Sequence, residues 1–342
     1  MSNYLPVRSD WLALGREETL EPELRIIDAH HHLWDRPGWR YLFDEYLADI
    51  RESGQRVAAT VYMQAQTMYR AGGPPSSRVV GETEFANGVA AMGASGRYGE
   101  TLVCAGIVAH VDLRLGDAAR DVLEAHVRAG NGRFRGIRHL TTWDADSSLM
   151  NPLSAGPPGL LADPAFRAGF AHLGRLGLTF DAWLFHPQLA ELTDLARAFP
   201  ETTIVLDHLG GILGIGGYAG RRDEIAGAWS REIRKLAECP NVAVKIGGLG
   251  MRINGFGFES GATPPSSSQL AETWRPYVET AIEAFGVARC MFESNFPVDK
   301  GSYGYGTVWN AFKRLTRAAS ASERYALFSG TAERIYGPLS PG

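Results

Sequence analysis

"IIDAHHHLWD" (residues 26–35) is a short apolar run that ends in three histidines. Side chains alternate between the two faces of a strand, so we expect Asp28, His30 and His32 on one face and His31 on the other. If that face lines the inside of a barrel, His30 and His32 project together at the end of the strand. A metal ion favours such a pair of imidazoles, with Asp28 as a supporting partner. The alternative is a set of strand-exit histidines bonded to loop carbonyls.

Seven further apolar, β-branched runs follow, and helical patterns separate them. The eight expected strands lie at residues 23–31, 56–65, 102–111, 133–140, 178–185, 202–209, 242–248 and 289–296. Helices are expected at residues 83–96, 116–130, 163–177 and 187–200. Continuous apolar strands that alternate with helices indicate a parallel sheet covered on both faces. Eight such units predict an α/β fold, a single (β/α)8 TIM barrel.

Gly-, Pro- and Ser-rich segments follow four of the expected strands, at residues 71–79, 144–162, 211–221 and 252–268. In a barrel they would be elaborated βα loops at the carboxyl ends of the strands, where active sites are built. We expect one barrel domain over residues 24–337, preceded by an N-terminal extension over residues 1–23. The extension could cover the base of the barrel or contact another subunit.

The composition excludes several classes of function. The net charge of −4 gives no electrostatic footprint for nucleic acid or an anionic membrane. The three cysteines have no close spacing, which argues against a disulfide framework or a cysteine zinc site and favours a reducing cytosol. There is no signal-peptide pattern and no apolar run of about 18 residues. We therefore expect a cytoplasmic protein that acts on a small molecule, with homo-oligomerisation left open.

Two further histidines lie where expected strands end. His186 stands in "WLFHP" and His208 in "VLDHLGG". Each alone would more often be a core or loop histidine. A barrel, however, brings the ends of different strands together, so these two and the pair His30 and His32 form a candidate site.

Several motifs in this order resemble the amidohydrolase-2 branch of the amidohydrolase superfamily: "DAHHHLWD", "RGIRHL", "VLDHLGG", "VAVKIGGL", "MFESNFPVD" and "SGTAERIYG". That branch contains TIM-barrel hydrolases, among them lactonases that act on sugar lactones, muconolactones and pyrone dicarboxylates. The resemblance extends from about residue 25 to residue 337. It implies the family and leaves the substrate open.

The resemblance implies a set of metal ligands. His30 and His32 match the first-strand His-x-His, which binds a divalent metal in some members and substrate in others, and His186 matches the fifth-strand histidine. Together they would hold one divalent ion, Zn²⁺ or Mn²⁺. His208 matches the histidine of an Asp-His-x-Gly turn. In a metal-free relative, His186 or His208 would be the base.

Four residues are expected to bind substrate. Arg138 matches an arginine that holds a substrate carboxylate in lactonase relatives, and the alternative is a salt bridge in the barrel wall. Lys245 matches a lysine common in this branch. Gln64 can hydrogen-bond substrate at the barrel mouth. Glu84 could do so as well, or it could serve as an acid near the positive end of a helix.

The eighth expected strand departs from the family pattern. Relatives usually end it with Gly-Ser-Asp, whose aspartate activates water, whereas this chain has "ESN" and ends in Asn295. An amide cannot accept a proton, but it can orient a water or donate to an oxyanion. Glu293 shares its face, and burial should raise the pKa of Glu293 and suit it to acid–base work. The alternative is a buried glutamate paired with Lys245 or Arg138, and Asp299 is another candidate base.

We expect a hydrolase that opens a lactone or related cyclic ester of a small carboxylated substrate. In this hypothesis a metal ion polarises the carbonyl or activates water, Arg138 anchors the substrate, and Glu293 or Asp299 takes the proton. Three alternatives stay open: a metal-free lactonase or lactone isomerase, a decarboxylase of an aromatic acid, and a ligand-binding pseudoenzyme.

Overall fold

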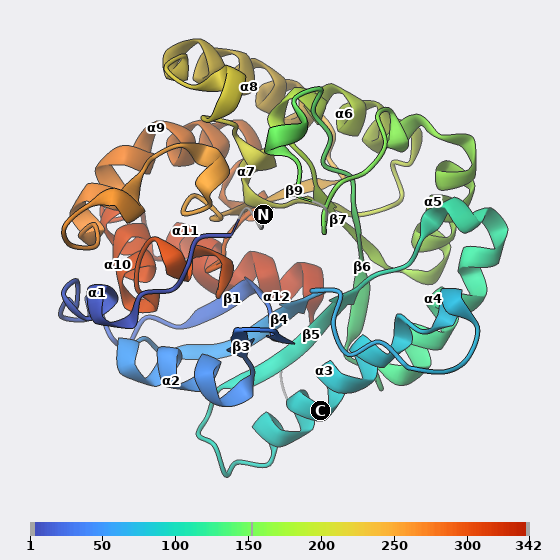
Figure 1. Cartoon of the computed structure of the whole chain (residues 1–342), viewed down its shortest axis with the longest axis horizontal. Coiled ribbons are helices and arrows are strands. Elements are labelled where there is room, and N and C mark those ends of the chain that lie inside the picture. Colours follow the sequence, from blue (N-terminus) through green and yellow to red (C-terminus); the bar gives the residue numbers. More distant parts are fainter. Residues whose placement is uncertain (1–3, 152, 340–342) are drawn as a thin grey trace.

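A computed structural model describes residues 4–151 and 153–339 and confirms the predicted barrel (Figure 1). Eight parallel strands pair in their order along the chain: β1 (Ile26–His31), β4 (Val57–Met63), β5 (Leu102–Ala109), β6 (Phe134–Leu140), β7 (Thr179–Trp183), β8 (Ile204–Leu206), β9 (Val242–Ile246) and β10 (Cys290–Phe292). The first and last strands close the ring just beyond β10. There the His32 N–H donates to the Phe296 carbonyl at 2.7 Å, and the Asn295 N–H donates to the His30 carbonyl at 2.9 Å.

Helices surround the barrel in Figure 1. They are α1 (Ser9–Ala13), α2 (Phe43–Ser53), α3 (Val80–Ala94), α4 (Ala119–Ala129), α5 (Pro164–Leu176), α6 (Leu189–Ala198), α7 (His208–Gly211), α8 (Arg222–Ala237), α9 (Ser267–Phe285), α10 (Tyr305–Leu315), α11 (Ala321–Tyr325) and α12 (Thr331–Tyr336). The four helices expected from the sequence correspond to α3, α4, α5 and α6. Helix α3 begins at Val80, three residues earlier than expected, which places Glu82 inside its first turn. None of the helices in the described residues is both long and apolar enough to cross a membrane.

Helix α5 illustrates how the sequence builds the outer layer. Asp163 caps its start by accepting a hydrogen bond from the Phe166 N–H at 2.8 Å, and a proline occupies the first helical position. Phe166, Phe170 and Leu173 are spaced for one helix face, and all three are completely buried. The helix ends at Gly177, whose φ of 65° suits a glycine cap.

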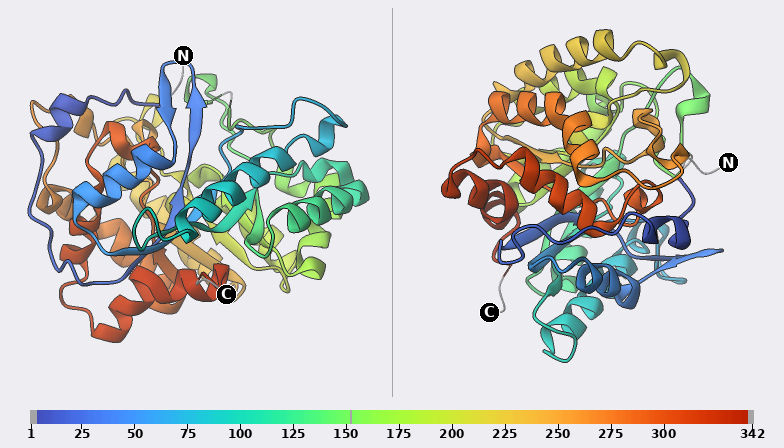
Figure 2. Two further views of the ribbon diagram at one scale, coloured as in Figure 1. Left: turned by 90° about the horizontal axis from the view of Figure 1, so that it is seen from below. Right: turned by 90° about the vertical axis from the view of Figure 1, so that its left-hand side faces the viewer.

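A small hairpin that the sequence analysis did not predict rises from the mouth of the barrel. It consists of β2 (Trp34–Arg36) and β3 (Trp39–Tyr41), which pair antiparallel. Gly38, with a φ of 75°, lies in the turn. Figure 2 shows the hairpin projecting from the body of the molecule, and the Tyr4 ring packs against its Trp34 and Trp39. The N-terminal segment therefore covers part of the mouth with Tyr4 and Leu5, and its contact with the base or another subunit stays a prediction.

Candidate active site

A pocket of about 790 Å³ opens where the carboxyl ends of the strands meet. Its lining includes side chains at or just beyond the ends of six different strands: His32, Gln64, Arg138, Trp183, His208 and Asn295. Leu149 and Arg252, from two of the expected βα loops, also contribute. Three arginines line the pocket, and no Asp or Glu of the described residues does. The pocket therefore offers a positive lining to a ligand.

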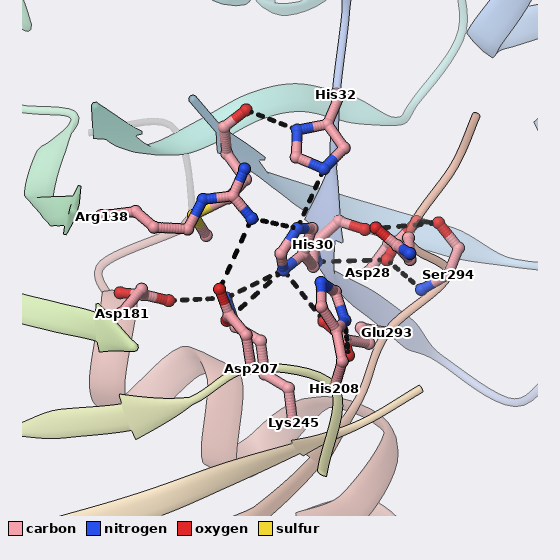
Figure 3. A network of polar contacts seen from close by, with 12 residues as sticks. Asp28, His30, His32, Arg138, Asp181, Asp207, His208, Lys245, Glu293 and Ser294 are labelled. Carbon is pink, nitrogen blue, oxygen red and sulfur yellow. Dashed lines mark hydrogen bonds and ion pairs between the residues drawn. The ribbon is translucent and has the colours of Figure 1, made fainter. Parts of the chain in front are cut away.

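His30 and His32 meet as the strand pattern predicted. Their Nε2 atoms lie 3.1 Å apart, and both residues are buried (Figure 3). The Nδ1 of His32 lies 2.9 Å from the Met63 carbonyl, which assigns the proton to Nδ1 and leaves a lone pair on Nε2. Burial holds the pKa of both imidazoles well below the usual range, with Lys245 adding to the effect at His30 and Arg138 at His32.

Asp28 does not support these imidazoles as expected. The pairing of β1 with β4 shifts register between Asp28 and His31, so the simple alternation does not hold along the strand. The Asp28 carboxylate instead accepts hydrogen bonds from the Tyr46 hydroxyl at 2.8 Å and the Ser294 hydroxyl at 2.6 Å. It helps to close the ring between β1 and β10.

Glu293 provides the support that was expected of Asp28. One of its oxygens accepts a hydrogen bond from His208 Nδ1 at 2.6 Å, and the other lies 3.0 Å from His30 Nδ1. Burial alone would raise the pKa of Glu293, but His208 and His30 outweigh it and hold the pKa below its usual range. The predicted raised pKa is therefore wrong. Glu293 is an ionised carboxylate that bridges two imidazoles, and its predicted pairing with Lys245 or Arg138 is replaced by this bridge.

The sequence makes room for this bridge with two glycines that follow β9. A Cβ at Gly247 would lie 2.4 Å from the Glu293 side chain, and a Cβ at Gly248 would lie 2.5 Å from the His208 ring. His208 itself has a φ of 54°, in the left-handed region that costs a residue with a side chain about 1–3 kcal/mol. Strain of this kind clusters at functional sites, and here it turns the imidazole toward the pocket.

Below the histidines lies a floor of buried charges. The Lys245 ammonium donates to Asp181 at 2.6 Å and lies 3.1 Å from Asp207 and 3.4 Å from His30 Nδ1. The hydroxyl of Tyr336, from α12, donates to the same Asp181 carboxylate at 2.5 Å. Lys245 is completely buried and does not line the pocket. Its predicted role in binding substrate is corrected to one of holding carboxylates beneath the site.

Asp207 is a site residue that the sequence analysis missed. It is completely buried, and its oxygens lie 3.5 Å from His30 Nδ1 and 3.5 Å from Arg138. Lys245 and the neighbouring cationic groups outweigh burial and lower the pKa of Asp207. The available signal was its position immediately before His208 in "VLDHLGG", at the exit of β8.

Arg138 and Gln64 lie together at the deep end of the pocket. One Arg138 nitrogen donates to the Gln64 carbonyl at 2.6 Å, and another lies 3.2 Å from His30 Nε2. The Nε of Arg138 and both amide atoms of Gln64 are buried without a hydrogen-bond partner among the described residues. Such groups are costly unless a ligand satisfies them, so both residues are suited to contact substrate.

Asn295 lines the pocket, and Asp299 lies behind it. The Asn295 Nδ2 donates to Asp299 at 2.9 Å, which leaves its Oδ1 for the pocket. Asp299 also accepts the Gly250 N–H at 3.0 Å and the Tyr303 hydroxyl at 2.5 Å. Burial raises the pKa of Asp299 to about 6. Since Asp299 does not line the pocket, its predicted role as base is replaced by that of an anchor for Asn295.

His186 does not join the other histidines. Strand β7 ends at Trp183, and His186 begins a 3-10 turn beyond it. Its Nδ1 accepts the Leu213 N–H at 3.2 Å, and its ring packs on Tyr218 at 5.4 Å between centroids. The predicted roles of His186 as a metal ligand and as a base are therefore corrected to a structural one.

Glu84 does not reach the pocket either. It forms an exposed ion pair with Arg70 on the surface of α3. The buried carboxylate of this helix is Glu82, which the sequence analysis did not single out. Glu82 accepts the Ala65 N–H at 2.5 Å and the Tyr62 hydroxyl at 2.8 Å, and burial raises its pKa to about 7. Glu82 thus fixes the peptide that follows Gln64.

The donor set fits a divalent cation. The Nε2 atoms of His30 and His32 lie 3.1 Å apart, close enough for one cation to contact both. In addition, His30, Asp207 and His208 bring one ligand atom each within 4.8 Å of one another. Nitrogen and carboxylate ligands of this kind suit Zn²⁺ and similar ions. Of the predicted ligands His30, His32 and His186, this group of three contains only His30. His32 is a second candidate ligand, because its Nε2 lies beside that of His30.

Known proteins resemble the chain over most of its length. A family model described as "Amidohydrolase" matches residues 27–337. An uncharacterized protein of Sinorhizobium fredii is 34% identical over 337 residues, covering 92% of this chain and 99% of the relative. An L-fucono-1,5-lactonase of Burkholderia multivorans is 27% identical over 328 residues, covering 92% and 97%. The crystal structure of an amidohydrolase from Burkholderia multivorans with bound Zn has a TM-score of 0.70 at 25% identity, covering 91% and 98%.

Proposed function

The chain belongs to the amidohydrolase family, and on that premise we propose that it opens a lactone or related cyclic ester of a small carboxylated substrate. The family and the lactonase named among the relatives support a hydrolase. The proposal of a lactone rests on the likeness to that lactonase and on the chemistry of the pocket.

The observation that carries the proposal is the short hydrogen bond between His208 and Glu293. Because His208 donates its Nδ1 proton to Glu293 at 2.6 Å, the neutral ring carries its lone pair on Nε2. His208 lines the pocket, whereas Glu293 does not. An imidazole held by a buried carboxylate is a suitable general base for a water molecule. We assign that role to His208 in place of Glu293 or Asp299.

The reaction then follows from the positions of the groups. His208 Nε2 removes a proton from a water molecule as the water oxygen adds to the carbonyl carbon of the lactone. The resulting imidazolium is stabilised by Glu293. As the bond between the carbonyl carbon and the ring oxygen breaks, His208 returns the proton to the ring oxygen. The product is an open-chain hydroxy acid.

The deep end of the pocket supports this reaction by binding oxygen atoms. Arg138 Nε and the Gln64 amide lack partners among the residues that the structure describes, so they are available to the lactone carbonyl. Donors aimed at an oxygen that gains charge stabilise the transition state. The Oδ1 of Asn295, which faces away from Asp299, can accept a hydrogen bond from the attacking water.

We further propose that the site holds one divalent ion, Zn²⁺ or Mn²⁺. His30 and His32 would hold it through their Nε2 atoms, which leaves His208 to act as the base. When bound, such an ion polarises a carbonyl or lowers the pKa of a bound water. The bound Zn in the amidohydrolase of Burkholderia multivorans supports this choice.

Ring opening of a lactone panel tests the hydrolase, with released acid followed by titration at constant pH. The panel contains sugar lactones and carboxylated lactones. We expect wild-type protein to open at least one carboxylated lactone and His208→Asn to lose about 10²–10⁴-fold in kcat. Release of carbon dioxide from aromatic acids instead of acid from lactones would overturn the proposal.

The metal is tested separately, on protein purified without a chelator. Elemental analysis should find one Zn²⁺ or Mn²⁺ per chain, and His30→Ala should lose it. Protein that is active and contains no metal would contradict the metal proposal and would leave the hydrolase proposal standing.

A further inference from the structure

The hairpin at the mouth of the pocket holds an arginine between aromatic rings. The Arg36 guanidinium lies 4.2 Å from the centre of the Trp34 ring and 5.6 Å from that of Tyr4. Its Nη2 donates to the Ala65 carbonyl at 2.7 Å. These contacts fix the orientation of Arg36 in the wall of the pocket.

Two nitrogen atoms in this wall have no hydrogen-bond partner. Within residues 4–151 and 153–339, the Arg36 Nη1 and the Trp34 Nε1 are both buried and unpaired. Trp34 as a whole is only 1% exposed. An indole N–H and a guanidinium can donate but never accept, so only an acceptor can satisfy them. The wall therefore calls for a ligand oxygen, and a carboxylate supplies two.

The charges of the pocket favour the same site for an anion. Arg138 lies 3.5 Å from Asp207, so its charge already faces a carboxylate. Arg36 forms no ion pair with any described residue, and it lies in a lining that contains none of the chain's described acids. An anionic group consequently gains more by binding Arg36 than by binding Arg138.

Arg36 and Arg138 donate hydrogen bonds to two consecutive backbone carbonyls. Arg36 binds the Ala65 carbonyl, and Arg138 binds the Gln64 carbonyl. Glu82 accepts the N–H of Ala65 and thereby holds both peptides in place. A small substrate whose ester lies beside Arg138 can therefore extend a second group to Arg36.

We propose that Arg36 and Trp34 form a subsite that binds the carboxylate of the substrate at the mouth of the pocket. The Tyr4 ring of the N-terminal segment completes it. This inference rests on the proposed function, because it takes this pocket as the substrate site. It moves the carboxylate from Arg138, where the family resemblance placed it, to the hairpin. Tyr4 precedes the segment that matches the family model, so the subsite includes a part of this chain outside that segment.

Calorimetric binding of two probes tests the subsite without any turnover. Benzoate carries a carboxylate, and benzamide has the same shape without the charge. We expect wild-type protein to bind benzoate more tightly than benzamide, and Arg36→Gln to bind benzoate at least about tenfold more weakly, with benzamide unchanged. Arg40→Gln is the matched control, since Arg40 lies on the same hairpin, is exposed, and pairs with Glu45. It should leave the affinity for both probes unchanged.

Trp34→Phe gives a second test. It retains an aromatic face for Arg36 and removes the indole N–H together with part of the ring, so benzoate should bind a few-fold more weakly, whereas the loss of ring area should weaken benzamide to the same small extent or not at all. Equal affinity of wild-type protein for the two probes would overturn the subsite. So would unchanged benzoate affinity in a folded Arg36→Gln variant, as judged by circular dichroism. Failure of every lactone to react, with the benzoate pattern intact, would overturn the proposed function alone.

Discussion

Buried polar groups have partners at the floor of the barrel and lack them at its mouth, among the residues that the structure describes. At the floor, Lys245 lies between Asp181 and Asp207, so each buried charge has an opposite charge beside it (Figure 3). At the mouth, Trp34 and Arg36 each bury a donor without an acceptor among the described residues. A buried group that is paired stabilises one structure, whereas an unpaired one gains a partner only from a ligand. The floor thus maintains the site, and under our proposal the mouth binds the substrate carboxylate.

The largest effect should come from breaking the floor. Lys245→Met removes the only cation that contacts both Asp181 and Asp207 in the described structure, which leaves Asp181 without a cation and Asp207 with Arg138 alone. We expect a loss of about 3–5 kcal/mol in the free energy of unfolding, measured by urea denaturation. Lys235→Met, at an exposed lysine of α8, is the control and should change stability little. A loss below about 1 kcal/mol in Lys245→Met would show that the floor is not structural.

The second-largest effect is expected at the pair of His208 and Glu293, which lies between the floor and the mouth. Glu293→Gln replaces a carboxylate that accepts a hydrogen bond from His208 and lies 3.0 Å from His30 Nδ1 with a neutral amide. We expect kcat to fall by about 10²–10⁴-fold with the fold retained. Glu84→Gln, at an exposed glutamate, should leave kcat unchanged. Near-normal turnover in Glu293→Gln would remove the His208–Glu293 pair from the mechanism.

Glu82 is both paired and unpaired, because one of its oxygens accepts hydrogen bonds and the other has no partner among the described residues. Burial raises its pKa to about 7, above the value of about 4.3 expected in an unfolded chain. Folding therefore favours the neutral form of Glu82. The contribution of this form to the free energy of unfolding is fully present below about pH 4 and is lost as the pH rises through 7. Between pH 5 and pH 8, wild-type protein should lose about 2–3 kcal/mol that Glu82→Gln retains.

Urea denaturation at the two pH values measures this difference. If wild-type protein and Glu82→Gln lose the same free energy of unfolding between pH 5 and pH 8, Glu82 is already ionised throughout that range.

Asn295→Asp tests whether the usual family base can be restored. In this structure the change would place a carboxylate oxygen next to Asp299, where an N–H now donates at 2.9 Å. Two carboxylates this close share a proton. We expect the variant to be about 1–3 kcal/mol less stable than wild-type protein at pH 8, with the difference smaller at pH 5, where Asp299 binds a proton. Higher lactonase activity in a stable variant at pH 8 would show that the site accepts the aspartate.

The smallest effect should come from the edge of the mouth. Tyr4→Leu removes one of the two rings beside Arg36, and we expect KM for a carboxylated lactone to rise about two- to fivefold with kcat unchanged. Tyr325→Leu, at an exposed tyrosine of α11, is the control. An equal fall in kcat would mean that Tyr4 affects the catalytic layer and not the substrate carboxylate.

The parts that the sequence predicted are those with a strong repeating pattern. All eight strands were predicted because most of them are apolar, β-branched runs, which are typical of buried parallel strands, and helical patterns separate them. The hairpin was missed because its strands have only three residues each and carry no such run. Likewise, His30 and His32 were placed together by alternation alone, in spite of the irregular register of β1.

The remaining site residues depend on where a strand stops. His186 was misplaced because β7 ends three residues before it, and the chain then enters a 3-10 turn. Asp207 was missed because alternation along the expected strand 202–209 places it on the face opposite His208, whereas β8 ends at Leu206 and alternation stops there. The pKa of Glu293 was predicted with the wrong sign because burial was visible in the sequence and the two imidazole partners were not.

The carboxylate shared by His30 and His208 has a consequence for the timing of the reaction. When His208 takes up a proton, the negative charge of Glu293 is drawn toward the new imidazolium, and His30 receives less of it. The two rings therefore communicate through a single side chain, and a proton gained by one makes the other a weaker electron donor. Under the proposed function, a change of charge at His208 therefore reaches His30 through one carboxylate.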